Sequence, residues 1–153
     1  LLGFYPDDVR LAKIAARCMT AGQAGQYNLP RAFRRGDPFV ARYAEVKFCV
    51  DLLSLVHLLA RRFAPYFKWV QRSAAGLPGL GARAAEAVSR LMTTTEPDGK
   101  AELVASLCGM VIDELYREGL SGSSSRLLLD HGPQVHRRIR DPELRRADVW
   151  AVP

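Results

Sequence analysis

The sequence predicts an all-α protein, an antiparallel bundle of five to seven helices joined by short connections. Apolar residues recur at three- and four-residue spacing over most of the chain, which is the period of one helix face. Proline, aspartate and glycine stand where helices begin and end, as at Asp37-Pro38 and at Gly119. The chain shows no alternation of strands with helices, which excludes a Rossmann or P-loop fold.

The first expected helix follows Pro6-Asp7-Asp8, because a proline and two acids are typical of a helix N-terminus. Apolar residues then keep helical spacing over residues 9–19. Residues 22–25 loosen the pattern, and residues 27–33 predict a separate short helix that closes near Gly36.

The next expected helix is the central one. Asp37 is a favourable N-cap and Pro38 suits the first helical position, so a helix is expected to begin here and to run to about Phe63. Pro65 ends or kinks it. Because residues 46–59 are apolar on most sides, we expect this helix to be the most buried.

Shorter helical patterns complete the bundle. They are expected at residues 66–73, 82–92, 100–118 and 133–139, followed by a capped turn at residues 141–145. Residues 77–81 and 93–99 are predicted to be turns, and residues 121–125, which are rich in serine, a flexible linker.

Length and composition bound the class of protein. With 153 residues, 48% of them apolar, the chain is expected to be one helical domain with its own core. No apolar run approaches the 18 or so residues of a membrane span, and no secretion signal is apparent. We therefore expect a cytoplasmic protein whose three scattered cysteines are buried thiols. The apolar start without Met indicates a C-terminal fragment of a longer polypeptide.

The formal net charge of +6 is concentrated in one segment. Between Arg31 and Arg72, nine Lys and Arg stand against three Asp and Glu, whereas the rest of the chain sums to zero. Such a basic segment indicates an anionic partner, for example phosphate or nucleic acid. A solvated basic flank is the alternative, and the sequence leaves both open.

Most motifs of catalytic chemistry are missing. The histidines lack the spacing of a zinc site, and the glycines of residues 76–81 lack the lysine and strand of a phosphate-binding loop. Arg126 and His131 have the Arg-x4-His spacing that resembles a motif of helical endoribonucleases, in which such a pair would polarise a phosphodiester and activate a 2′-hydroxyl. A leucine follows Arg126 where that motif typically has a polar residue.

A polar stripe marks one face of the expected central helix. Its members are spaced by four, three, three and four residues: Lys47, Asp51, Ser54, His57 and Arg61. In one interpretation Asp51 pairs with Lys47 one turn away. In the other, Asp51 lines a cleft and accepts hydrogen bonds from hydroxyl or amino groups of a substrate.

The segment after this helix interleaves cations with aromatic rings, a pattern that holds phosphates and stacks on flat rings. The alternative interpretation is that the aromatic residues Phe63, Phe67 and Trp69 belong to the core, while the cations extend to solvent. In the binding interpretation, Lys68 faces a phosphate, Trp69 offers a flat face and Asp51 orients an acceptor group. The predicted binding surface comprises Tyr27, Arg31, Asp51, Arg62, Tyr66, Lys68 and Trp69.

Several segments carry a resemblance to a known family. This chain resembles a bacterial helical domain of uncharacterised function in four segments: residues 3–11, residues 21–28 with the run Gly25-Gln26-Tyr27-Asn28, residues 65–69 with the run Tyr66-Phe67-Lys68-Trp69, and residues 139–145. That domain typically follows a minimal-type nucleotidyltransferase domain in the same polypeptide. The resemblance extends over nearly the whole chain, and the two quoted runs are its most specific parts.

The resemblance implies a division of labour between two domains. The catalytic domain of such enzymes holds Mg²⁺ and a nucleoside triphosphate through a Gly-Ser motif and an Asp-x-Asp pair, and the helical domain closes over the cleft and presents the acceptor. This sequence has no Gly-Ser followed by Asp-x-Asp, so no cofactor is expected on this chain itself. Helical domains of the related aminoglycoside-modifying enzymes bind the acceptor through acids and an aromatic residue, which agrees with Asp51 and Trp69.

Two classes of function remain open. The first is an accessory, substrate-binding domain of a nucleotidyltransferase, whose partners are the upstream catalytic domain and a nucleotide or small-molecule acceptor. The second is a free-standing helical module for protein interaction or nucleic-acid binding, ribonuclease-like through Arg126 and His131. The sequence natively upstream of this chain distinguishes the two, and neither class involves a membrane.

Overall fold

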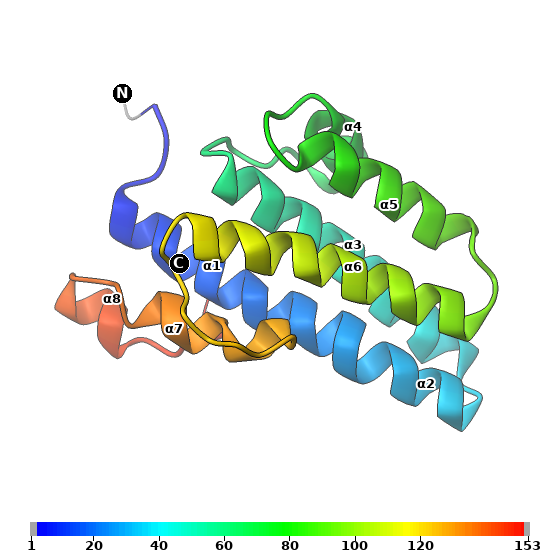
Figure 1. Cartoon of the computed structure of the whole chain (residues 1–153). Helices are drawn as coiled ribbons and strands as arrows, with labels where there is room; N and C mark the ends of the chain where they lie inside the picture. Colours follow the sequence, from blue (N-terminus) through cyan, green and yellow to red (C-terminus); the bar gives the residue numbers. More distant parts are fainter. Residues whose placement is uncertain (1–2, 152–153) are drawn as a thin grey trace.

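Helices make up most of residues 3–151, the range that this computed structural model describes (Figure 1). Within it the chain forms eight α-helices and no strand: α1 Asp7–Gly22, α2 Leu29–Arg35, α3 Pro38–Leu59, α4 Phe67–Ala75, α5 Gly81–Thr93, α6 Pro97–Arg117, α7 Gly132–His136 and α8 Pro142–Arg146. A π-helical segment, η1 (Gln23–Asn28), joins α1 to α2, and a 3-10 turn, η2 (Leu128–Asp130), precedes α7. The predicted all-α bundle is confirmed.

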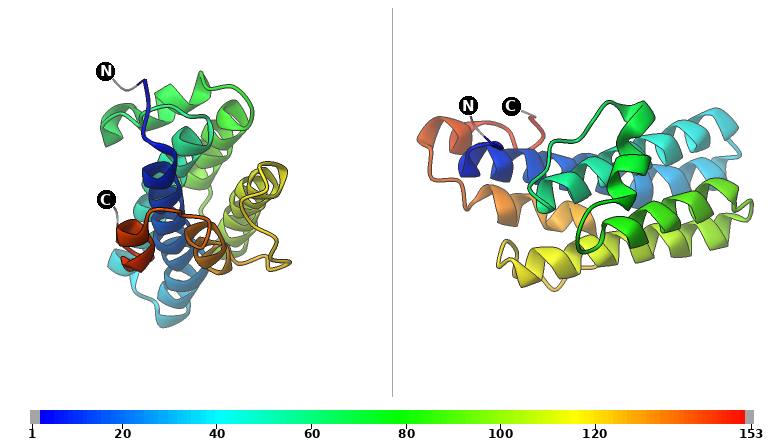
Figure 2. Two further views of the ribbon diagram at one scale, coloured as in Figure 1. Left: turned by 90° about the vertical axis from the view of Figure 1, so that its left-hand side faces the viewer. Right: turned by 90° about the horizontal axis from the view of Figure 1, so that it is seen from above.

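The bundle is built on a long helical hairpin. α1, η1 and α2 make one continuous rod, and α3 runs back along it (Figures 1 and 2). Side-chain contacts fix the antiparallel register, because Arg10 near the start of α1 reaches Leu58 at the end of α3, and Arg17 reaches Asp51. α5 and α6 pair beside this hairpin, α4 crosses the C-terminal end of α3, and α7 packs on α1.

The predicted break at residues 22–25 does not occur, because the helix continues through η1 with a wider turn. Gly25 lies against the buried ring of Phe48 so closely that an added Cβ would stand 2.3 Å from Cδ2 of that ring. An added Cβ on Gly22 would stand 2.8 Å from the backbone nitrogen of Leu129. These glycines therefore serve close packing and do not interrupt the helix.

α3 begins where the sequence predicts and ends earlier. Asp37 Oδ1 accepts a hydrogen bond of 3.0 Å from the backbone N–H of Val40, which is the expected N-cap contact. The helix ends at Leu59 and not near Phe63, because Arg61 adopts a φ of 54° in the left-handed region. Pro65 consequently lies in the connection to α4 and does not end α3.

The core contains the three cysteines that were predicted to be buried thiols. All three are buried and none forms a disulfide. Burial raises the pKa of the Cys108 thiol to about 12, and burial together with the Glu45 carboxylate raises the pKa of the Cys49 thiol to about 12. These thiols stay protonated and unreactive near neutral pH. No helix within residues 3–151 has the length and apolar character needed to cross a membrane.

Residues 121–125 are held in place, contrary to the predicted flexible linker. Ser121 Oγ lies 2.7 Å from Nδ1 of His131, and the carbonyl of Ser125 lies 2.9 Å from Nε2 of the same ring. The hydroxyl of Tyr116 donates to the carbonyl of Ser123. Serine hydroxyls bond the nearby backbone in place of solvent, so a serine-rich composition here gives a fixed connection between α6 and η2.

Candidate functional site

Asp51 lies between α1 and α3 and is almost fully buried, with 2% of its surface exposed. Its Oδ1 accepts a hydrogen bond of 2.9 Å from Nη1 of Arg17. Its Oδ2 is 2.6 Å from Nζ of Lys47, one turn earlier on α3. Both carboxylate oxygens are thus compensated by cations, as the burial of a charge requires.

Arg17 also lines a pocket where α1, α3 and the segment before α4 meet. We call it the cationic pocket; its volume is about 350 Å³. It is lined by Tyr5, Lys13, Arg17, Ser54, Leu58, Ala64, Pro65, Tyr66 and Phe67. This lining, all of it within the described residues, includes two cations and no carboxylate, so the pocket attracts anions.

The two cations lie one turn apart on the same face of α1. Burial, and in smaller part the Arg17 guanidinium, lowers the pKa of Lys13. The Nζ atom of Lys13 also lies 4.8 Å from the centre of the Tyr5 ring, in a cation–π contact. A bound anion would offset the repulsion between the two cations and favour the charged form of Lys13.

Three aromatic residues line the cationic pocket: Tyr5, Tyr66 and Phe67. Tyr5 packs edge-on against Phe63, with ring centres 4.8 Å apart, and Phe4 joins the same cluster. Tyr66 and Phe67 form a second pair, with ring centres 4.5 Å apart. Both rings of this pair are more than half exposed, which leaves their faces open to a flat ligand.

An apolar stripe leads along α3 to this pocket. Its residues Phe39, Tyr43, Val46 and Val50 follow the spacing of one helix face, and the next residue on that face is Ser54 of the cationic pocket. The first three are 80%, 64% and 53% exposed. The apolar stripe is therefore an uncovered face, since a helix normally turns such side chains toward the core.

The predicted binding residues do not converge on one surface. Tyr66 lines the cationic pocket, and Asp51 reaches it only through its contact with Arg17. Arg62, Lys68 and Trp69 are exposed and do not line the pocket. Trp69 instead carries the guanidinium of Arg72 over its ring, 5.6 Å from the centre.

Tyr27 and Arg31 lie farther along the rod, in η1 and α2. Tyr27 is ten residues beyond Arg17, which corresponds to roughly 15 Å along a helix. The two side chains contact each other, with Arg31 Nη1 donating to the Tyr27 hydroxyl at 2.8 Å. The structure therefore does not bring this pair together with the residues after α3 that line the cationic pocket.

The two interpretations of the polar stripe on α3 are resolved by the contacts. Asp51 does pair with Lys47. His57 is fully buried between the carbonyl of Leu53 and the hydroxyl of Ser73, which ties α3 to α4. The core alternative for the following aromatic residues is wrong, because Phe63, Phe67 and Trp69 are each about half exposed.

The pocket residues Tyr5, Lys13 and Arg17 were missed from the sequence. They lie in α1 and just before it, whereas the segment with an excess of positive charge begins at Arg31. One local signal was available, because two cations four residues apart stand on a helix otherwise rich in buried alanine. Their link to Asp51 spans 34 residues and depends on how α1 packs against α3.

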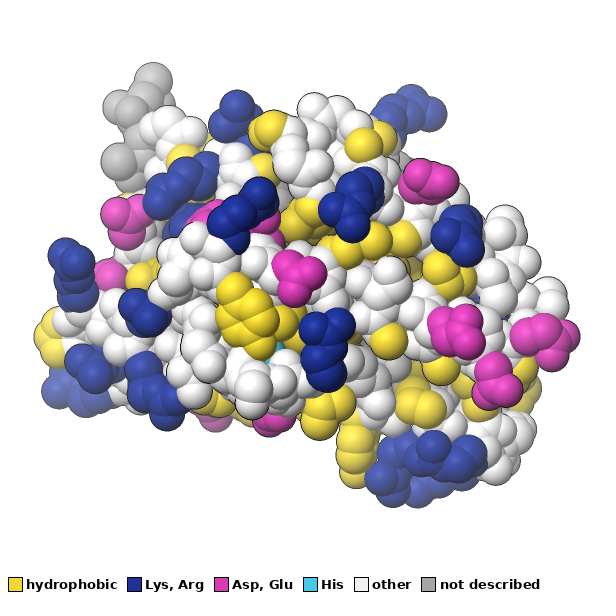
Figure 3. Space-filling view, in the orientation of Figure 1, with side chains coloured by type: hydrophobic (Ala, Val, Ile, Leu, Met, Phe, Trp, Pro, Cys, Tyr) yellow, Lys and Arg dark blue, Asp and Glu magenta, His cyan; other side chains and the backbone are white. Residues whose placement is uncertain are grey.

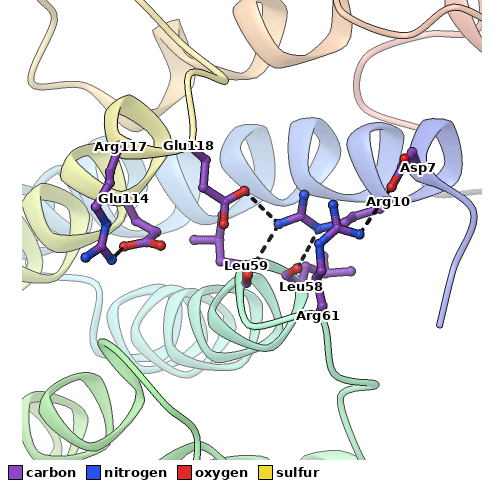
Figure 4. A network of polar contacts seen from close by, with 8 residues as sticks. All are labelled: Asp7, Arg10, Leu58, Leu59, Arg61, Glu114, Arg117 and Glu118. Carbon is purple, nitrogen blue, oxygen red and sulfur yellow. Dashed lines mark hydrogen bonds and ion pairs between the residues drawn. The ribbon is translucent and has the colours of Figure 1, made fainter. Parts of the chain in front are cut away.

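A second polar network closes the end of the hairpin (Figure 4). Arg10 is 3% exposed, and its guanidinium donates to the carbonyls of Leu58 and Leu59 and to the carboxylate of Glu118. The Leu58 carbonyl also accepts a hydrogen bond of 3.2 Å from the backbone N–H of Arg61, so the guanidinium reinforces the turn that ends α3. This network joins α1, α3 and the end of α6, and its contacts indicate a structural role.

Arg126 and His131 do not form an open dyad. His131 is fully buried, and both of its ring nitrogens contact serine oxygens, as described above for residues 121–125. Arg126 is exposed and passes close to Gly109 of α6. This arrangement favours a structural role for His131.

Residues 3–151 contain no group of three or more His, Cys, Asp or Glu side chains placed to hold a metal ion. The buried carboxylate of Asp51 is already paired with cations, because Arg17 contacts its Oδ1 and Lys47 contacts its Oδ2.

Comparison with known families finds a match to the N-terminal part of the chain. A family described as a domain of unknown function (DUF4037) matches residues 1–70. The matched segment contains α1 to α3 and every residue of the cationic pocket, and it ends within α4. No curated protein and no solved structure matches the chain.

Proposed function

We propose that this chain is the accessory, substrate-binding helical domain of a nucleotidyltransferase, an enzyme that transfers a nucleoside monophosphate to an acceptor. In this proposal the chain is the C-terminal part of a longer polypeptide. In this arrangement the catalytic domain upstream holds Mg²⁺ and the nucleoside triphosphate. The helical domain supplies the acceptor side of the cleft.

The observation that carries the proposal is the apolar stripe running into the cationic pocket. A domain that works against a catalytic partner needs an uncovered face for that partner beside a cavity for substrate, and α3 provides both on one face. Arg42 and Lys47 flank the stripe. The partner surface is therefore expected to be apolar at its centre and carboxylate-rich at its rim.

The cationic pocket suits the substrate side of this arrangement. Lys13 and Arg17 provide positive charge, and Tyr66 and Phe67 provide exposed ring faces. Arg17 is held by the buried Asp51, so its position is set before a ligand arrives. In this assignment Asp51 is a positioning residue and does not itself touch the acceptor.

Hydroxyl-radical footprinting tests the proposal. Phe39 and Tyr43 should be labelled strongly in the isolated chain and several-fold more slowly in the natural polypeptide, because the catalytic domain would cover the apolar stripe. Tyr116 is the control, since it is also partly exposed but contacts the segment after α6. Equal labelling of Phe39 and Tyr43 in both forms, with Tyr116 unchanged, would contradict the proposal.

The second candidate, a free-standing module that binds nucleic acid, is favoured by two basic surfaces. Lys and Arg side chains gather over α2 and over α7 and α8 (Figure 3). The exposed cations there are Arg34, Arg35, Arg137, Arg138, Arg140, Arg145 and Arg146. This candidate predicts binding of RNA or DNA by the isolated chain that weakens steeply with added salt.

A further inference from the structure

The cationic pocket has the size and the wall chemistry of a site for a small ligand. Its volume of about 350 Å³ lies in the range of small-molecule pockets, which begins near 300 Å³. Its walls separate into a charged side on α1, with Lys13 and Arg17, and an aromatic side before and at the start of α4, with Tyr66 and Phe67. A ligand with one anionic end and one flat end fits both.

The charged side favours an anion of more than one negative charge. Arg17 and Lys47 share the Asp51 carboxylate, so its charge is divided between two cations, and Lys13 adds a further positive charge one turn from Arg17. Arg17 remains about a quarter exposed despite its contact with Asp51. A phosphate offers several acceptor oxygens in the arrangement that a guanidinium and an ammonium group bind together.

The pocket also supplies hydroxyl groups near its charged side. Ser54 Oγ donates to the carbonyl of Val50 at 2.9 Å, and its oxygen can still accept a hydrogen bond from a ligand in the pocket that it lines. Tyr5 and Tyr66 bring phenol groups to the same lining. Hydroxyl groups both donate and accept hydrogen bonds, so they can bind sugar hydroxyls as well as phosphate oxygens.

We propose that the cationic pocket binds a nucleotide-class ligand, with its phosphate on Lys13 and Arg17 and its flat ring against Tyr66 and Phe67. This inference rests on the proposed function in placing a substrate of the transfer reaction on the helical domain, and it adds the chemical class of that substrate. Asp51 holds Arg17 in place for the phosphate. The exposed pair of rings then selects ligands that carry a base.

Calorimetric titration of the isolated chain tests this inference with AMP, adenosine and inorganic phosphate as probes. AMP should bind saturably, and adenosine should bind about tenfold more weakly or worse, because it lacks the charge-assisted contacts of the phosphate. Inorganic phosphate should also bind more weakly than AMP, since it lacks the ring. Equal binding of AMP and adenosine, or no saturable binding of AMP, would overturn the inference.

Variants separate the two sides of the site. Lys13→Gln should weaken AMP by about tenfold, whereas Arg90→Gln, an exposed cation on α5, should leave it unchanged. Tyr66→Ala, at an exposed ring that does not support the core, should weaken AMP but not inorganic phosphate. Unchanged AMP affinity in both pocket variants, with folding verified by circular dichroism, would place the ligand elsewhere and overturn the inference.

The pH dependence gives a further readout. Lys13 binds phosphate in its charged form, so AMP affinity should be highest below the lowered pKa of Lys13 and should fall as the pH rises through it. In Lys13→Gln this alkaline decline should disappear. If the alkaline decline persists in Lys13→Gln, Lys13 does not bind the phosphate.

The outcomes of the two experiments are distinguishable. If Phe39 and Tyr43 are protected in the natural polypeptide while AMP fails to bind, this inference falls and the proposed function stands.

Discussion

Asp51 joins two helices through two cations, Arg17 on α1 and Lys47 on α3. The carboxylate is buried, while both cations remain partly exposed at their outer side. A buried carboxylate with matched partners holds the cations in fixed positions, and removal of its charge leaves them without compensation. Asp51 does not line the cationic pocket, but it fixes the position of Arg17, which does.

Substitution of Asp51 by asparagine should therefore lower stability. Asp51→Asn should reduce the free energy of unfolding by about 1–3 kcal/mol, because it removes the buried charge that pairs with Arg17 and Lys47. Urea unfolding followed by circular dichroism measures it. Asp113→Asn, an exposed aspartate on α6, is the matched control and should change the free energy by less than about 0.5 kcal/mol. Equal unfolding midpoints for the two variants would show that Asp51 does not carry the contact.

The start and the end of α3 are fixed by different kinds of contact. α3 starts at a local signal, the Asp37 N-cap, but its end is fixed by a residue from another helix, because Arg10 of α1 binds the carbonyls of Leu58 and Leu59. The left-handed Arg61 then turns the chain out of the helix toward the aromatic segment. This early end leaves Tyr66 and Phe67 beside α1, where they form a wall of the pocket.

At this end of the bundle, substitution of Arg10 should lower the stability of the fold more than substitution of its neighbours in the polar network. Arg10→Leu removes a buried guanidinium from two carbonyls and from Glu118, and should destabilise the fold by about 3 kcal/mol or more. Asp7→Asn breaks only the exposed pair with Arg61 in the same network and should cost less than about 1 kcal/mol. Thermal unfolding compares them, and a loss no larger in Arg10→Leu than in Asp7→Asn would refute this role.

At the scale of the whole molecule, the sequence predicts what depends on local chemistry. The all-α class, the start of α3 at Asp37 and the Asp51–Lys47 pair are all set by residues within a few positions of one another. The continuous helix through Gly25 and the early end of α3 were not predictable, because Phe48 and Arg10 act across the hairpin.

The candidate site was predictable only in fragments. Asp51 and Tyr66 were identified from their segments, but the cations that define the pocket come from α1 and meet α3 only after folding. Tyr27 and Arg31 share the basic and aromatic composition of the site, yet the unbroken rod carries them away from it. Composition shows which chemistry is present, and packing decides which side chains meet.

The central claim, that this chain is the acceptor-binding partner of a nucleotidyltransferase domain, is tested most directly by pyrophosphate release from nucleoside triphosphates with Mg²⁺. The natural polypeptide should release pyrophosphate, since transfer of a nucleoside monophosphate produces it. The isolated chain should release none, because its described residues offer no carboxylate cluster for Mg²⁺. Turnover by the isolated chain, or no release by the natural polypeptide, would contradict the claim.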